Sequence, residues 1–283
     1  MVLTKEQAEG ELDEVYGQYA QFEDKNLKIF VINLKPALRR RRFMELQLDN
    51  PGLPQWQIVE AVDGRLLNTA EMNDYYDESA TIKNIGRALT PSEIGCALSH
   101  IKVLKMVVEE RIPFALICED DVVIGRSAFP VIQKLMTMMN PSDPNVTILG
   151  NAQTYSSWGI KKVDRFHKLV RVHKSYGTYA YLISLNAAEK FIQNSLPICS
   201  SADDWLLYER QRGFQMLGVV PYCISPSFLN NMSTIGNTRH EMMRAASQSR
   251  GFSDKVAHYF KKRFSAPQLL KLLKRVKTQP MIW

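Results

Sequence analysis

A run of five apolar residues leads directly into three acids, and this junction constrains the fold more than any other part of the sequence. Residues 114–118 read FALIC, and Glu119, Asp120 and Asp121 follow. A short, continuous apolar run is typical of a strand buried on both faces. The three carboxylates then lie at the end of this strand, where burial of their charge is costly unless a cation compensates it. The junction therefore predicts a cation-binding edge on a buried sheet.

Strands and helices are expected to alternate on both sides of this junction. Residues 28–34 (KIFVINL) form another buried strand, and a turn at Pro36 and a helix through Leu48 follow it. The sequence TPSE at 90–93 is a helix start, because threonine can cap, proline fits the first turn and glutamate can return a hydrogen bond. Such alternation predicts an α/β sheet, with ligands at the carboxyl ends of its strands. Further strands are expected near residues 56–62, 146–149 and 168–184, and helices from Asn186 and from about Ser201.

A hard divalent ion is the natural partner of the acidic triplet. Mg²⁺ or Mn²⁺ binds through one or two carboxylates together with the phosphate oxygens of a nucleotide. If strand alternation continues past Cys118, Glu119 and Asp121 point to one side and Asp120 to the other. Glu119 and Asp121 would then act as a pair, one reaching a ribose and the other the metal. The alternative is that the three acids only begin a solvated loop.

Four sequence blocks together resemble a known family of enzymes. In order they are KIFVINL (28–34), LTPSEIGCALSHIKVLK (89–105), ALICEDDVVI (115–124) and GTYAYLIS (177–184). They are similar to the hallmark blocks of glycosyltransferase family 25, which includes bacterial lipooligosaccharide galactosyltransferases and is similar to the collagen galactosyltransferases of animals. The resemblance implies a GT-A type, Rossmann-like fold with a mixed, mostly parallel sheet flanked by helices. It also implies a UDP-sugar donor, most often UDP-galactose, and an inverting reaction that gives a β linkage.

The resemblance implies roles for individual residues. Its Asp-x-Asp variant maps onto residues 119–121, where Glu119 and Asp120 would contact the donor and Glu119 and Asp121 the metal. Its strand-end asparagine, its helix arginine and its Ser-His pair would also bind the donor, and they map onto Asn33, Arg40, Ser99 and His100. Because four arginines occupy positions 39–42, the one that faces the nucleotide stays open.

The second half of the sequence offers candidates for two further roles, a general base and a third metal ligand. An inverting transfer needs a base that takes the proton from the acceptor hydroxyl. Asp203 and Asp204 are candidates, since they lie at an expected helix start beside Trp205, which could stack on a sugar. Acids are also favoured in the first turn of any helix, and the sequence does not separate the two. His240, in a polar stretch after Pro226, is a candidate third metal ligand.

The net positive charge of the chain comes from its C-terminal end. The 283 residues carry a net charge of +7, yet residues 239–283 hold eleven Lys or Arg against two acids. The preceding body is therefore close to neutral, which argues against a nucleic-acid groove across the fold. We expect an acidic appendage at residues 1–26, a catalytic domain at 27–238 and a basic extension at 239–283.

The basic extension is predicted to be helical and to meet a membrane surface. Leucines and Val276 fall on one face of residues 265–277, and lysines and Arg275 on the rest, as in helices that bind anionic lipids. The sequence shows neither a membrane-spanning run nor a signal-like start. We therefore expect a cytoplasmic protein, attached peripherally to the inner membrane, where it would meet a lipid-linked oligosaccharide acceptor. The alternative is a solvated helix packed on the domain.

Two other classes of function compete with a transferase. Acids at a strand end also serve metal-dependent phosphoester hydrolases, but these usually add a nucleophilic Asp, and the first strand offers Asn33 instead. A catalytically silent homologue that binds glycans or lipids is the second alternative, since sequence does not prove turnover.

Overall fold

The computed structural model describes residues 26–193 and 195–227, together with the backbone of residues 273–275. The strands are β1 (Leu27–Asn33), β2 (Trp56–Glu60), β3 (Phe114–Glu119), β4 (Val122–Ile124), β5 (Asn145–Ile148), β6 (Ala152–Ser156), β7 (Lys161–Lys162), β8 (Lys168–Ser175), β9 (Ala180–Ser184), β10 (Gln215–Val220), β11 (Ile224–Pro226) and β12 (Leu273–Arg275). The helices are α2 (Leu38–Leu48), α3 (Thr69–Tyr75), α4 (Glu78–Ile85), α5 (Pro91–Glu109), α6 (Ala128–Met138), α7 (Leu185–Gln193) and α8 (Trp205–Arg212), with a 3₁₀ turn at Gly64–Leu66. Among the described residues, no helix is both long and apolar enough to cross a membrane.

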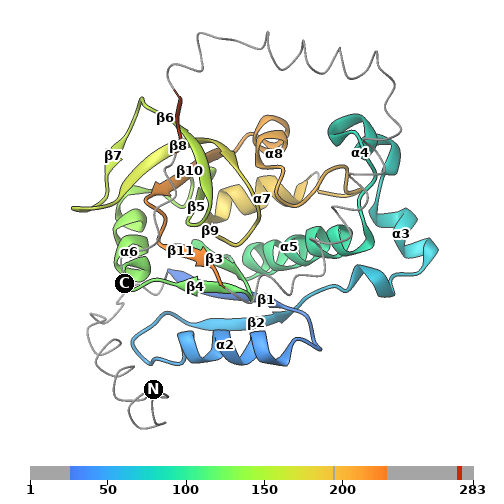
Figure 1. The fold of residues 1–283 in the computed structure, drawn as a ribbon, viewed down its shortest axis with the longest axis horizontal. Helices are drawn as coiled ribbons and strands as arrows, with labels where there is room; N and C mark the ends of the chain where they lie inside the picture. The colour runs from blue at the N-terminus through green and yellow to red at the C-terminus, as the bar shows by residue number, and fades with distance from the viewer. Residues whose placement is uncertain (1–25, 194, 228–272, 276–283) are drawn as a thin grey trace, which may run out of the picture.

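One large mixed sheet forms the centre of the fold (Figure 1). Its strand order is β12-β6-β8-β10-β5-β9-β3-β1-β2, and β7 pairs with β8 at the side. β1 runs parallel to both β2 and β3, and β5 runs parallel to β10. β9 lies antiparallel between β3 and β5. The predicted α/β class, with a mixed sheet flanked by helices, is therefore confirmed.

Helices cover both faces of the sheet because its central strands are apolar on both sides. Along β1, Phe30 and Ile32 belong to a core shared with α5, α7 and α8. Ile29 and Val31 belong to the opposite core, which α2 and α6 complete. Side chains that alternate between two cores are what a strand buried on both faces requires. The apolar residues of β3 alternate between the two cores in the same way. Its last residue, Glu119, therefore lies at the edge of the sheet, at the end of a buried strand.

The longest described helix starts as the sequence predicts. The backbone N–H of Glu93 donates to Thr90 Oγ1 at 3.2 Å, and the N–H of Thr90 donates to Glu93 Oε2 at 2.9 Å. This reciprocal pair is a capping box, and Pro91 occupies the first turn. Arg87 also binds Glu93, at 2.6 Å. The start of α5, and with it the placement of residues further along the helix, is therefore fixed by buried contacts.

The C-terminal extension differs from the prediction where it is described. Leu273–Arg275 form strand β12, which pairs antiparallel with β6, whereas the sequence predicted a helix there. The helical prediction is wrong for these three residues, because pairing with a distant strand overrides the local amphipathic pattern. The remainder of that extension, the N-terminal appendage and His240 lie outside the described residues. The predicted domain boundaries stay predictions.

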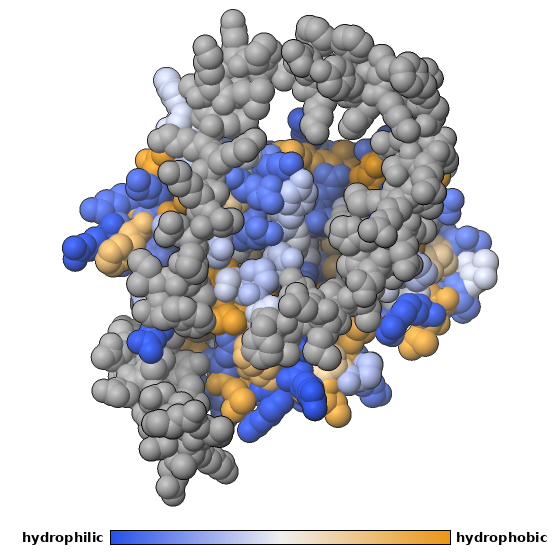
Figure 2. All heavy atoms as spheres, in the orientation of Figure 1, coloured by the Kyte–Doolittle hydropathy of each residue, from blue (hydrophilic) through white to orange (hydrophobic). Residues whose placement is uncertain are grey.

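The described surface carries isolated apolar side chains. On the face shown in Figure 2, apolar side chains are scattered among hydrophilic ones. The most exposed large ones in the described ranges are Leu66, Trp158 and Leu38, which belong to different parts of the chain. Isolated exposed apolar residues are normal in soluble domains and identify no binding surface by themselves.

Candidate functional site

Parallel pairing brings the ends of β1 and β3 to one edge of the sheet. Ile32 is the register partner of Glu119, so Asn33 and Asp120 follow side by side. The side-chain amide of Asn33 donates to Asp120 Oδ2 at 2.7 Å, and both side chains are buried. Two segments 87 residues apart are thus joined at the carboxyl ends of their strands, where α/β sheets bind ligands.

Arg40 brings a fixed positive charge to the acids. It lies in the first turn of α2, which starts directly after β1. Its guanidinium donates to Asp120 Oδ1 at 3.0 Å and lies 3.3 Å from Asp121 Oδ2. Arg41 and Arg42 instead pair with Glu45 on the exposed face of the helix. The sequence did not show which of the four arginines lies at the site. In the structure, Arg40 contacts the acidic triplet.

The strand alternation considered for the three acids does not continue beyond Glu119. β3 ends at Glu119, and Asp120 and Asp121 form a turn before β4. Because the turn ends the strand geometry, Asp120 and Asp121 both face Arg40, while Glu119 lies beside His100 and Thr178. Asp120 and Asp121 thus share Arg40, while Glu119 has other partners but lies close enough for its charge to raise the pKa of Asp121.

The buried carboxylate of Asp121 is only partly neutralised by Arg40. Its Oδ1 atom is buried and has no hydrogen-bond partner among the described residues. Burial, followed by the charge of Glu119, raises the pKa of Asp121 to about 7 despite the opposing effect of Arg40. Burial also raises the pKa of Asp120. One guanidinium does not balance the charge of three neighbouring acids, so a divalent ion with oxygen ligands fits this edge. Asp121 and Glu119 are the side chains that would hold it.

Glu119 is held by a network that reaches two other elements. Thr178, just before β9, donates a short hydrogen bond to Glu119 Oε1. His100 of α5 places its Nε2 3.8 Å from the same oxygen, and its Nδ1 lies 2.9 Å from the Tyr181 hydroxyl. Cys96, one helical turn before His100, lies close enough that the charge of Glu119 contributes to the raised pKa of its thiol, whose main cause is burial. Glu119 is therefore part of a site built from α5, β3 and β9.

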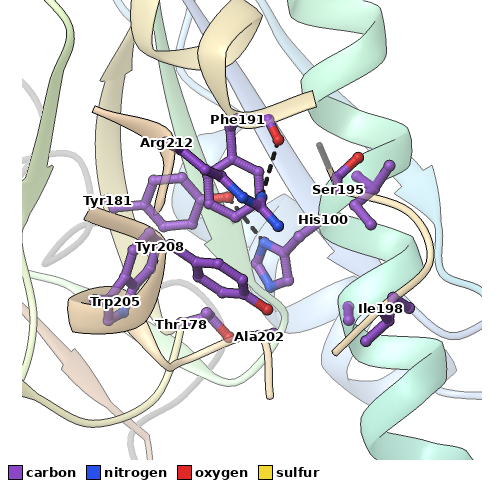
Figure 3. Close-up of a pocket in the computed structure, with 12 residues that line it drawn as sticks. His100, Thr178, Tyr181, Phe191, Ser195, Ile198, Ala202, Trp205, Tyr208 and Arg212 are labelled. Carbon is purple, nitrogen blue, oxygen red and sulfur yellow. Dashed lines mark hydrogen bonds between the residues drawn. The ribbon is translucent and has the colours of Figure 1, made fainter. Parts of the chain in front are cut away.

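The ring of His100 also forms part of the wall of a narrow cavity. Figure 3 shows this ring beside Tyr181 and Tyr208, with a dashed line for the bond to Tyr181. The cavity lies between α5, α7 and α8, and Trp205 and Phe191 also line it. Its lining is mostly apolar and aromatic, which lowers the local dielectric and strengthens electrostatic interactions of the imidazole.

The structure separates the two predicted base candidates. Asp204 is the N-cap of α8: it accepts from the N–H of Leu207 at 3.4 Å and from the Ser200 hydroxyl at 2.6 Å. Its carboxylate thus has a structural role, as acids at helix starts commonly do. The Asp203 carboxylate instead accepts from the N–H of Gly177 at 3.1 Å, next to Thr178. Asp203 therefore contacts the loop that holds Glu119, whereas Asp204 stabilises its helix.

Ser99, unlike His100, is used for backbone packing. Its hydroxyl accepts from the N–H of Val62 at 2.8 Å and donates to the carbonyl of Gly95 at 2.7 Å. These bonds hold the segment after β2 against α5. A Cβ on Gly95 would lie 2.5 Å from the carbonyl oxygen of Val62, so only glycine permits this close approach. The contacts of Ser99 do not include the acids.

Sequence reasoning missed Cys96 and Thr178 as site residues. Cys96 and His100 are four residues apart, a spacing that places two side chains on the same helix face, so this signal was available. Thr178 lies within the block GTYAYLIS but carries no local signal of its contact with Glu119.

The family profile described as "Glycosyltransferase family 25 (LPS biosynthesis protein)" matches residues 26–206, which is well over half of the chain and contains the acidic edge. The chain belongs to glycosyltransferase family 25. Among similar family members, the human "Procollagen galactosyltransferase 2" is 33% identical over 175 residues, covering 58% of this chain and 27% of the relative. The zebrafish (Danio rerio) "Procollagen galactosyltransferase 1" is 30% identical over 176 residues, covering 59% of this chain and 28% of the relative.

A bovine (Bos taurus) family 25 protein carries a different description. It is named "Probable inactive glycosyltransferase 25 family member 3" and is 30% identical over 178 residues, covering 58% of this chain and 28% of the relative. The aligned part thus spans about a quarter of the length of each of these relatives. Membership of family 25 is therefore shown, while activity has to be argued from the site.

Proposed function

We propose that the protein is an inverting glycosyltransferase that moves a hexose from a UDP-sugar onto a saccharide acceptor. The proposed donor is UDP-galactose, and the transferred sugar is galactose. The observation that carries this proposal is the buried acidic edge, in which Asp121 Oδ1 has no partner while Arg40 lies 3.3 Å from Oδ2. A divalent ion and a diphosphate together satisfy such an edge, since the ion meets the carboxylates and the phosphates meet the arginine. The galactosyltransferase names of two relatives support the choice of sugar.

The residues at this edge have distinct roles in the proposed reaction. Arg40 holds the acids and meets phosphate oxygens, and Asn33 orients Asp120. A divalent ion bound by Asp121 and Glu119, Mn²⁺ or Mg²⁺, would offset charge on the departing diphosphate. Thr178 fixes the carboxylate of Glu119. These side chains are positioned by β1, α2, β3 and the segment before β9, so little reorganisation is needed when the donor binds.

Asp203 is the proposed general base. It would take the proton from the acceptor hydroxyl as that oxygen attacks the anomeric carbon from the face opposite the leaving nucleotide. Its bond to Gly177 places it beside the loop that supports Glu119, within the same neighbourhood as the donor edge. Asp204 is not proposed for this role, because its carboxylate caps α8.

Turnover of UDP-sugars tests the proposal directly. Purified protein with Mn²⁺ would be given a panel of UDP-hexoses, with and without a lipooligosaccharide core acceptor, and UDP release and glycan mass would be measured. We expect UDP-galactose to release UDP faster with acceptor present, with a β linkage in the product. UDP binding without any turnover would support a silent homologue, and cleavage of simple phosphoesters without sugar transfer would support a hydrolase. The hydrolase is disfavoured because the first strand carries Asn33 where such enzymes usually have a nucleophilic Asp.

The charge of the C-terminal segment supports a proposal for the acceptor and the cellular location. We infer that the acceptor is a lipid-linked lipooligosaccharide or lipopolysaccharide precursor, and that the protein works in the cytoplasm on the inner membrane surface. Residues 261–263 read KKR within residues 239–283, the segment in which basic residues exceed acidic ones. Anionic vesicles should therefore pellet the wild-type chain more strongly than a Lys261→Gln/Lys262→Gln/Arg263→Gln variant. Equal pelleting would remove this inference.

A further inference from the structure

Three potential metal ligands converge beside the acidic edge. Cys96 and His100 lie one turn apart on α5, and Glu119 ends the neighbouring strand β3. The ligand atoms of these three side chains all lie within 4.8 Å of one another. Among groups of three or more His, Cys, Asp and Glu side chains in the described ranges, this is the one whose ligand atoms are close enough to share an ion.

His100 supplies an independent sign that a ligand belongs here. Its Nε2 is buried, lacks a hydrogen-bond partner among the described residues and lies 3.8 Å from Glu119 Oε1. Leaving such a buried polar atom without a hydrogen-bond partner is energetically unfavourable. Its Nδ1 already pairs with the Tyr181 hydroxyl, which fixes the ring orientation. An imidazole anchored through one nitrogen and open at the other is the usual arrangement of a metal-binding histidine.

The chemical types of the three ligands indicate which class of metal ion would bind. A thiolate, an imidazole and one carboxylate suit a borderline-soft cation, whereas Mg²⁺ and Mn²⁺ prefer oxygen ligands. Zinc sites with three protein ligands keep a fourth position for water. With metal–ligand distances of about 2.0–2.3 Å, tetrahedral ligand atoms lie about 3.3–3.6 Å apart. Side-chain shifts of about 1 Å would therefore close the present arrangement around an ion.

We propose that Cys96, His100 and Glu119 form a Zn²⁺ site that shares Glu119 with the hard-ion edge at Asp121. Zinc bound there takes up Glu119, which the proposed function assigns to the donor metal, so zinc inhibits sugar transfer. The inhibitory consequence rests on that proposed function, whereas the binding of zinc does not. On binding, the Cys96 thiol gives its proton to solvent and its sulfur bonds to the ion, so one proton leaves for each zinc bound.

Binding can be measured without any assay of activity. The full-length protein would be titrated with Zn²⁺ against a chromophoric chelator, and with Co²⁺ while the thiolate-to-cobalt absorption band is followed. We expect one site per chain, loss of the cobalt band in Cys96→Ser, and a fall in zinc affinity of at least about 10-fold in His100→Gln. Cys199→Ser is the matched control, because Cys199 is also a half-buried free cysteine. It should retain both signals.

Two results would overturn the zinc site: wild-type protein without a thiolate-to-cobalt band, or a band that Cys96→Ser retains. If Cys96→Ser fails to fold, as thermal unfolding would show, the His100→Gln titration decides, and unchanged zinc affinity in that variant counts against the site. Inhibition is judged separately, from the ratio of transfer rates with and without zinc in each variant. A cobalt band in a protein that transfers no sugar would uphold the metal site and reject the proposed function.

Discussion

The amide of Asn33 donates a 2.7 Å hydrogen bond to Oδ2 of Asp120 and so joins the ends of two parallel strands. Arg40 binds the other oxygen of the same carboxylate at 3.0 Å. Asp120 is therefore satisfied from both sides, while its neighbour Asp121 keeps a buried oxygen without a partner. This difference between adjacent acids is the physical basis for assigning orientation to one and metal binding to the other.

Loss of the Asn33 amide should destabilise the protein. In Asn33→Ala, a buried oxygen of Asp120 loses its donor, and we expect the free energy of unfolding to fall by about 1–3 kcal/mol. Urea denaturation would measure this change. Lys35→Ala, an exposed substitution two residues away, is the control and should leave stability within about 0.5 kcal/mol of wild type. Equal stability of Asn33→Ala and Lys35→Ala would contradict the contact described here.

The raised pKa of Asp121 predicts how the stability of metal-free protein depends on pH. Its folded pKa of about 7 lies above the unfolded value of about 3.9, so the folded state binds the extra proton between these limits. This contribution to stability is fully present below about pH 4 and is lost as pH rises through about 7. Asp121→Asn removes the charge and should be more stable than wild type by at least about 1 kcal/mol at pH 8. Thermal unfolding with a chelator, from pH 4 to 8, would show converging curves at low pH; parallel curves would refute this explanation.

Asp203 and Asp204 should differ in the kind of defect that they cause. Asp203→Asn should lower kcat by about 10²–10⁴-fold, as expected for loss of a general base, while UDP affinity remains close to that of wild type. Asp204→Ala should mainly lower stability, by about 1 kcal/mol, because it removes the N-cap of α8. Steady-state kinetics and denaturation of both variants separate the two roles. Wild-type turnover by Asp203→Asn would exclude it as the base.

The close approach of α5 to residues 62–64 predicts an intolerant glycine. Gly95→Ala puts a Cβ 2.5 Å from both the Val62 carbonyl oxygen and the Gly64 nitrogen. We expect a loss of about 1–3 kcal/mol in stability, since two backbone segments have to separate. Lys105→Ala, on the exposed side of the same helix, provides the comparison in denaturant titrations. An unchanged free energy of unfolding in Gly95→Ala would show that α5 does not pack tightly against residues 62–64.

Features that depend on local sequence were predictable. The buried strands β1 and β3 follow from uninterrupted apolar runs, and the start of α5 follows from Thr90 and Glu93. These predictions needed only patterns within a few residues of one another. The resemblance to family 25 assigned both Asn33 and the acids to the donor, and their direct contact became known only from the structure.

Features that depend on distant contacts were not predictable. The direction of Asp120 and Asp121 depends on the turn into β4, which pairs with β11 about a hundred residues later. Asp203 was separable from Asp204 only once Gly177 and Ser200 were placed beside them. Likewise, β12 forms through pairing with β6, against a local pattern that favoured a helix. In each case a contact remote in sequence decides the local conformation.

Calorimetric titration with UDP, with and without Mn²⁺, tests the central claim that the acidic edge binds a divalent ion and a diphosphate together. Wild-type protein should bind UDP much more tightly when Mn²⁺ is present, and Asp121→Ala should lose that enhancement while remaining folded. UDP binding that ignores Mn²⁺ and persists unchanged in Asp121→Ala would contradict the account.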